Sequence, residues 1–318
     1  MKKPATRLLL GLALIVSGAL LFGLAVNFFQ NQGTEPTQTA TPTGPVKVVA
    51  STNVYGSIAK FLGGDYVDVT SIISDVKQDP HSYEASARDQ LAVSEAELVI
   101  FNGGGYDEFM NTLLLAVEGE KHVIEIVDGD HAHESESQAH EDHDHANEHV
   151  WYDIELMRVA AEHIANDISS LRPESLETVN ANYDLFISEL DNLQLRLDAL
   201  RDRSIGLGVI AIEGVANLML EHAGFVDQTP EELTNAIEED REVPAAALKE
   251  AKLLIEGKLV SLVVANLQQQ DAVTAQLVDS AEKVGVPTVA LSELIPDPSW
   301  DYLDWMANNV DKLQEAIY

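Results

Sequence analysis

The segment PESLETVNANYDLFISELDNLQLRLDALRDR, residues 173–203, decides the fold of this chain. Its apolar residues recur at alternating intervals of three and four positions, at Leu176, Val179, Tyr183, Phe186, Leu190, Leu193, Leu197 and Leu200. This spacing places them on one face of an α-helix. Pro173 suits the first helical position, and Gly206 and Gly208 follow the end. The pattern therefore predicts a helix over residues 173–203, roughly 46 Å long at about 1.5 Å per residue, within a linking segment over 172–204.

Strand-like and helix-like stretches alternate on both sides of this helix. The predicted strands are VKVVAS (46–51), VDVTSII (67–73), ELVIFN (97–102), HVIEIV (122–127), GVIAIE (208–213), LVSLVVAN (259–266) and VPTVAL (286–291). Helices are expected over 54–62, 86–93, within GGGYDEFMNTLLLAV (103–117), and over 154–170, 214–222, 245–256, 271–283 and 300–317, with an acidic loop before residue 245. The alternation predicts an α/β fold of two βα lobes with parallel sheets, joined by one long rigid helix. A coiled-coil dimer is the alternative interpretation of the long helix, but its repeat is short and βα patterns flank it.

The N-terminal residues predict an export signal followed by a tether. Lys2, Lys3 and Arg7 precede an apolar run from Leu8 to about Phe29, which is the secretory pattern. The run is close to the roughly 20 residues that span a bilayer, so residues 1–29 are either a cleaved signal or a retained anchor. Residues 30–45 form a Thr/Pro-rich tether. We therefore expect the rest of the chain to lie outside the cytoplasm, with an N-terminal lobe over 46–171 and a C-terminal lobe over 205–318.

Composition excludes several classes of protein. The 318 residues include 53 acidic and 19 basic residues, which give a net charge of −34. A general nucleic-acid binder needs a basic face, so that class is excluded. Cysteine is absent. Disulfides and thiolate metal sites are therefore excluded, and so is lipid attachment of the bacterial lipoprotein kind, leaving His and carboxylate as ligands for any metal.

A His-rich tract within residues 128–148 points to metal. Its five histidines are His131, His133, His140, His143 and His145, interleaved with Asp and Glu. The tract has too few apolar residues to build a core. It is either a solvated acidic loop with incidental histidines or a set of weak, auxiliary metal ligands, and imidazole is a common ligand of transition metals.

Four further polar residues lie where binding sites form in α/β proteins. His81 follows the turn at Asp79-Pro80, and His149 lies between the tract and the next helix. Glu213 ends the strand GVIAIE, and Glu293 follows the strand VPTVAL. Each alone is compatible with an ordinary surface residue. Because ligands of open α/β sheets bind beyond the carboxyl ends of strands, the set together predicts a site in a cleft between the lobes.

At these residues the chain resembles the zinc/manganese-type (cluster A-I) solute-binding proteins of bacterial metal ABC transporters. The matching stretches are STNVYGSIAKFLGG (51–64), DPHSYE (79–84), ELVIFNGGGYDEFM (97–110), HVWYD (149–153) and YLDWMANNVDKL (302–313). The resemblance covers about residues 46–318. It implies two βα lobes joined by one long helix, in agreement with the pattern derived above.

The resemblance also implies a set of metal ligands. His81 and His149 match the first two ligands of the family, and Glu213 matches the third. The fourth is usually an Asp, where this chain has Ser292-Glu293; Glu293 is our choice and Asp297 is the alternative. Two neutral imidazoles and two carboxylates match a divalent cation, and four protein ligands leave no open position for catalysis.

The resemblance implies a monomeric receptor, not an enzyme, that binds a divalent metal outside the cytoplasm and delivers it to an ABC permease. His-rich loops in this family are associated with zinc, so we expect Zn²⁺, with a manganese or iron receptor as the alternative. Two other classes are a surface metal buffer or adhesin that works through its His-rich tract, and a zinc hydrolase. The hydrolase is disfavoured because no HExxH motif occurs. We also expect metal affinity to fall below about pH 6, as imidazoles protonate.

Overall fold

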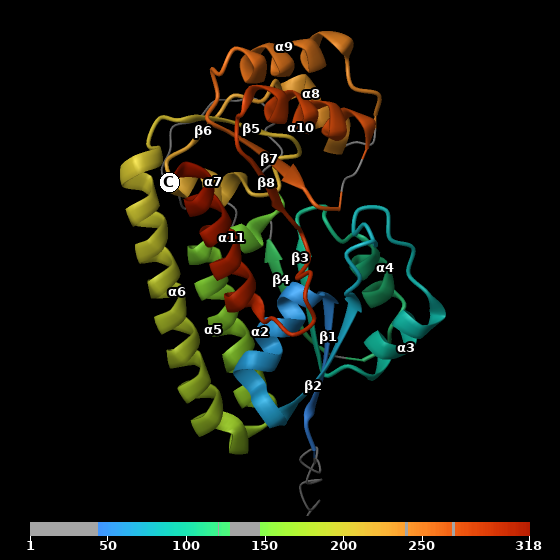
Figure 1. Ribbon diagram of the computed structural model, residues 1–318. Helices are drawn as coiled ribbons and strands as arrows, with labels where there is room; N and C mark the ends of the chain where they lie inside the picture. Colours follow the sequence, from blue (N-terminus) through green and yellow to red (C-terminus); the bar gives the residue numbers. More distant parts are fainter. Residues whose placement is uncertain (1–43, 120, 128–146, 239–240, 269–270) are drawn as a thin grey trace, which may run out of the picture. The chain divides into compact units, whose positions relative to one another are not determined.

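Two parallel sheets organise the computed structural model, which describes residues 44–119, 121–127, 147–238, 241–268 and 271–318. The first contains β1 (Val46–Thr52), β2 (Val67–Ile73), β3 (Leu98–Gly103) and β4 (His122–Val127) in the order β2-β1-β3-β4. The second contains β5 (Gly208–Ala211), β6 (Val226–Asp227), β7 (Leu262–Asn266) and β8 (Thr288–Leu291) in the order β6-β5-β7-β8 (Figure 1). The two sheets have the same topology. In each, the first and third strands along the chain lie side by side in the middle, with the second strand on one side and the fourth on the other, so the direction of winding reverses between the two middle strands. That reversal is where open sheets place ligands.

Helices connect and cover the strands. They are α2 (Asn53–Gly63), α3 (Ala87–Glu95), α4 (Phe109–Leu115), α5 (Ile154–Leu171), α6 (Leu176–Ser204), α7 (Asn217–His222), α8 (Glu231–Glu238), α9 (Ala245–Glu256), α10 (Ala272–Val284) and α11 (Tyr302–Ile317). Short 3-10 turns occur at Gly64–Tyr66, Val150–Tyr152 and Pro173–Ser175. The predicted α/β class with parallel sheets and one long helix is confirmed.

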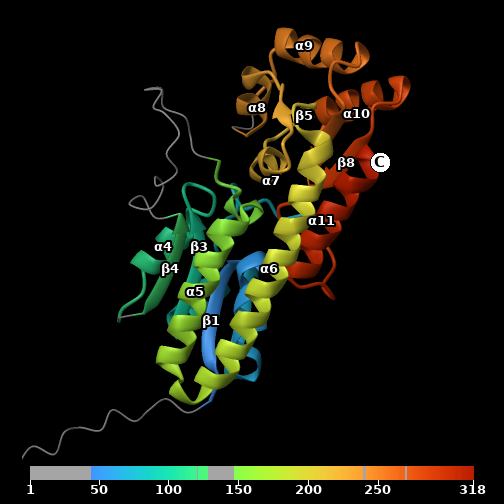
Figure 2. The ribbon, with the colours of Figure 1, turned by 90° about the vertical axis from the view of Figure 1, so that its left-hand side faces the viewer.

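The long helix α6 packs within its own chain. Its apolar stripe is buried at Val179, Phe186, Leu190, Leu193, Leu197 and Leu200, whereas Leu176 in its first turn is 52% exposed. Helices α2, α5 and α11 contact α6, which is drawn in yellow in Figure 2. The 3-10 turn Pro173–Ser175 precedes it, so the regular helix begins three residues later than predicted. The repeat therefore fills an intramolecular interface and not a dimer seam.

The central strands β1, β3, β5 and β7 bury both faces, as their near-continuous apolar sequences require. Val48, Ala50 and Ile100 face the largest core, which also contains the buried residues of α5, α6 and α11. The alternate residues Val49 and Val99 face a second core under α3 and α4. A third core lies between the second sheet and α8, α9 and α10.

One predicted loop contains regular structure. The acidic segment before residue 245 includes β6 and the helix α8, so its assignment as a loop is wrong. Helix α8 buries Leu233, Ala236 and Ile237 at helical spacing. It is only eight residues long, and its first turn contains Glu231 and Glu232. A helix this short depends on packing against its neighbours more than on its own sequence.

The closing helix α11 contacts both halves of the chain. The Tyr302 hydroxyl donates to the backbone carbonyl of Trp151, and the Tyr302 backbone N–H donates to Ser57 Oγ. Residues 44–318 form one compact unit. The boundaries 46–171, 172–204 and 205–318 remain predictions.

Some predictions lie outside the described residues. They are the signal or anchor over 1–29, the tether as far as residue 43, and the tract histidines His131, His133, His140, His143 and His145. Within the residues that the structure describes, no helix combines the length and the apolar character needed to cross a membrane.

Candidate metal site

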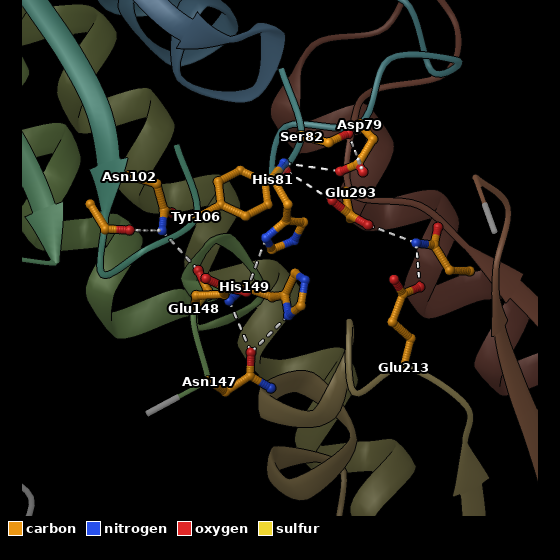
Figure 3. Close-up of polar contacts among 12 residues, drawn as sticks. Asp79, His81, Ser82, Asn102, Tyr106, Asn147, Glu148, His149, Glu213 and Glu293 are labelled. Atoms are coloured by element: carbon orange, nitrogen blue, oxygen red, sulfur yellow. Dashed lines mark hydrogen bonds and ion pairs between the residues drawn. The ribbon is translucent and has the colours of Figure 1, made fainter. Parts of the chain in front are cut away.

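All four predicted ligands follow the carboxyl ends of parallel strands. They are His81 after β2, His149 after β4, Glu213 after β5 and Glu293 after β8. Figure 3 shows His81 and His149 beside each other, and Glu213 and Glu293 grouped next to them. The four side chains thus lie beyond strand ends, where open sheets bind ligands, and their role as metal ligands remains a prediction.

The two imidazoles form the first part of the site. Their ring centroids are 6.2 Å apart. Asn147 Oδ1 accepts from the backbone N–H of His149 and lies 3.0 Å from its Nδ1. Since Nδ1 must carry the hydrogen of that bond, His149 Nε2 presents a lone pair. Nε2 is buried and has no hydrogen-bond partner among the described residues, which suits a metal ligand.

The two buried carboxylates share one amide donor. Asn266, the last residue of β7, donates from Nδ2 to Glu213 Oε2 at 2.6 Å and to Glu293 Oε1 at 2.7 Å. Glu213 is 6% exposed and Glu293 is 3% exposed. The amide therefore holds together two side chains whose negative charges would otherwise repel each other.

Tyr106 joins the two parts of the site. Its hydroxyl donates to Glu293 Oε2 at 3.0 Å, and its ring meets the His81 and His149 rings edge-on at 5.0 and 6.0 Å. It follows a turn formed by Gly103, Gly104 and Gly105, whose φ angles of +76°, +64° and +105° favour glycine. Asp107 accepts from two backbone N–H groups at the start of this turn. This turn between β3 and α4 thus places a tyrosine in the site.

Burial keeps both imidazoles neutral. It lowers the pKa of His149 to about 3, and the neighbouring His81 contributes to the shift. Burial also lowers the pKa of His81, against the opposing effect of Asp79. The neutral form is the one that binds metal, so both pKa shifts favour binding and lower the pH at which protons compete with the metal for the imidazoles.

Burial has the opposite effect on two carboxyl groups. It raises the pKa of Glu148 to about 7, and three neighbouring carboxylates add to the shift. It also raises the pKa of Glu293 to about 7, although the hydrogen bonds that Glu293 accepts oppose this. The contact of 3.4 Å between His81 Nδ1 and Glu148 Oε1 is therefore not a fully charged ion pair near neutral pH. A divalent cation would offset the charge of both carboxylates.

The sequence analysis does not predict three residues of the site: Glu148, Tyr106 and Asn266. Asn266 had the same signal as Glu213, a polar residue ending an apolar strand, and Glu148 directly precedes a predicted ligand. The alternative ligand Asp297 instead accepts hydrogen bonds from the backbone N–H and hydroxyl of Ser299, which lower its pKa. Glu293 is therefore better placed than Asp297 to be the fourth metal ligand.

Comparisons with known proteins agree with this architecture. PsaA, a manganese ABC transporter substrate-binding lipoprotein of Streptococcus pneumoniae, is 30% identical over 154 residues. The alignment covers 46% of this chain and 49% of PsaA, so the chain spans about half the length of the curated relatives it matches.

Solved structures show the same fold over most of the chain. The periplasmic zinc-binding protein TroA of Treponema pallidum superposes with a TM-score of 0.68 at 18% identity, covering 86% of this chain and 99% of TroA. A mutant of the laminin-binding adhesin Lmb of Streptococcus agalactiae gives 0.70 at 19%, covering 86% and 100%.

A family profile matches most of the chain. It is the one described as zinc-uptake complex component A, periplasmic, and it matches residues 48–316. That span includes both sheets, the long helix and all four predicted ligands. The chain therefore belongs to this family of solute-binding proteins of metal uptake systems, which are not enzymes.

Proposed function

We propose that this chain is the metal-binding receptor of an ABC uptake transporter and that it binds Zn²⁺ outside the cytoplasm. His81, His149, Glu213 and Glu293 hold the ion, which a membrane permease then receives. The observation that carries the proposal is the buried Nε2 of His149, which has no hydrogen-bond partner among the described residues and lies beside His81. Tyr106 packs against both imidazoles and donates to Glu293, and Asn266 joins Glu293 to Glu213. With at least these four protein ligands the ion has no open position for a catalytic water, as expected of binding rather than hydrolysis.

Zinc is the preferred cargo for two reasons. The family that matches is described by zinc uptake, and the His-rich tract offers additional imidazoles near His149 in sequence. Imidazole is a common ligand of zinc, whereas manganese prefers oxygen ligands such as carboxylates.

Manganese is the second candidate. PsaA is named for manganese, and carboxylate oxygens suit that ion. Bidentate carboxylates would raise the coordination number toward the one that manganese prefers. Calorimetric titration with each ion tests the assignment: because nitrogen and oxygen ligands generally bind Zn²⁺ more tightly than Mn²⁺, equal or tighter binding of Mn²⁺ would overturn zinc as the transported ion.

Metal analysis of the protein purified without added metal tests the site. We expect about one tightly held zinc ion per chain and its loss in a His81→Ala variant. His163→Ala is the matched control, because His163 is exposed on α5 and lies outside the site. Equal zinc content in both variants would exclude the proposed ligands.

We assign the His-rich tract an auxiliary role, in which His131, His133, His140, His143 and His145 bind metal weakly. The alternative is a surface metal buffer or adhesin whose tract is the functional part. Deletion of residues 130–146 separates the two: the auxiliary role predicts that one tight zinc site survives, whereas the alternative predicts that tight binding disappears.

A further inference from the structure

Glu148 is a carboxylate that the four-ligand site leaves unused. Its Oε1 lies 3.4 Å from His81 Nδ1. One potential ligand atom from each of His81, Glu148 and His149 lies within 4.8 Å of the other two. The Glu148 side chain is 22% exposed, so an arriving ion can reach it, and Figure 3 shows it beside both imidazoles.

The backbone of Glu148 is held independently of its side chain. Its carbonyl accepts from Asn102 Nδ2 and from the Val150 backbone N–H, both at 2.9 Å. Asn102 is buried at the end of β3. The carboxylate can therefore be changed without removing the contacts that hold the loop.

The spacing of the three side chains suits a metal ion. Zinc bonds of about 2.0–2.2 Å in a tetrahedral arrangement require ligand atoms roughly 3.4 Å apart. The His81–Glu148 contact already has that length, and the His149 ligand atom lies within 4.8 Å of the other two. His149 adds a second indication of a ligand, because its Nε2 is buried and unpartnered among the described residues.

The three residues also belong to one side of the site. His81 and His149 follow strands of the first sheet, and Glu148 precedes His149. Glu213 and Glu293 follow strands of the second sheet, where Asn266 binds both of them. The first set is therefore separate from the pair of carboxylates that Asn266 holds.

We propose that His81, Glu148 and His149 form a set that binds a divalent cation without Glu213 and Glu293, and that Glu148 remains a fifth ligand of the completed site. The inference rests on the proposed function, because it shares His81 and His149 with it. A third carboxylate strengthens the attraction for a divalent ion and raises the number of ligands from four to five.

Zinc competition titrations on full-length variants test the set. A Glu213→Gln/Glu293→Gln double variant should keep measurable but weakened zinc binding. Adding Glu148→Gln to it should weaken the remaining binding at least about tenfold, the lower end of the losses seen when partners of metal ligands are removed. The His-rich tract is unchanged in both variants, so the difference between them is due to Glu148. Equal affinity in the two variants would overturn the inference.

The single variants keep the test decisive if the multiple variants do not fold. Glu148→Gln alone should weaken zinc binding at least about tenfold. Glu84→Gln, which removes the same charge from an exposed residue of the His81 loop, should have no effect. Unchanged affinity in Glu148→Gln, with loss of binding in His81→Ala, would exclude Glu148 as a ligand and retain the proposed function. Unchanged affinity in His81→Ala would instead reject the proposed function itself.

Discussion

Asn147 contacts both parts of the site through one side chain. Its Oδ1 orients His149, and its Nδ2 donates at 2.9 Å to the carbonyl of Gly214, the residue after Glu213. Partners that orient a ligating histidine typically contribute about tenfold to hundredfold to metal affinity. We expect Asn147→Ala to weaken zinc binding by about that factor in calorimetric titration.

The control for this prediction is Asn147→Asp. The carboxylate keeps an acceptor for His149 Nδ1 but cannot donate to Gly214, so Asn147→Asp should bind zinc more tightly than Asn147→Ala. The same affinity in both variants and in the unmodified chain would show that this hydrogen bond does not orient His149.

Two carboxyl groups determine how the metal affinity depends on pH. Glu148 and Glu293 have pKa values of about 7, so each binds a proton increasingly below that pH, and the proton must leave when metal binds. We therefore expect affinity to fall between about pH 8 and about pH 6, by up to about tenfold per pH unit for each carboxyl group. His149, with a pKa of about 3, contributes only at much lower pH.

Competition titrations across this range check the prediction, and repeated calorimetry in buffers of different ionisation enthalpy counts the protons released. Glu148→Gln should release fewer protons. A constant affinity across the range would contradict the assignment of these two carboxyl groups.

At the scale of elements, the stability of α6 depends on its buried stripe. Leu197 is 1% exposed within it, whereas Leu195 on the opposite face is 66% exposed. We expect Leu197→Ala to lower the free energy of unfolding by about 2–5 kcal/mol, since it leaves a cavity in the core. Leu195→Ala should change it by less than about 0.5 kcal/mol. Urea denaturation of the metal-free protein measures both, and equal effects would contradict the orientation of the helix.

The elements also show how far sequence patterns predict a fold. Helix α6 and strands β1 to β4 have long, regular apolar patterns, and these were found close to their true bounds. The short elements β6 and α8 were missed, because two and eight residues carry too little periodicity to identify them. Their conformation depends on the core that Leu233 and Ile237 enter.

At the scale of the whole molecule, the loop that carries Glu293 is bound by residues from the first half of the chain. Asn53 pairs with both the backbone N–H and the carbonyl of Ile295, and the Tyr152 hydroxyl donates to the Ser292 carbonyl at 2.7 Å. These contacts join segments more than 100 positions apart in sequence. They oppose a wide separation of the two parts of the site.

We therefore expect small changes of shape when metal binds. Small-angle X-ray scattering of the protein with and without zinc should give nearly superimposable profiles. A large interlobe rotation between metal-bound and metal-free crystals would contradict this expectation.

Local periodicity and a general rule of sheet topology are enough to predict the parallel α/β architecture, the long helix and the four polar positions beyond strand ends. How those positions combine depends on the packing of the folded chain. It places Glu148 beside His81, joins Glu213 to Glu293 through Asn266, and connects the two groups through Tyr106. Such contacts, and the burial that shifts the pKa values, depend on residues far apart in sequence, which no local pattern records.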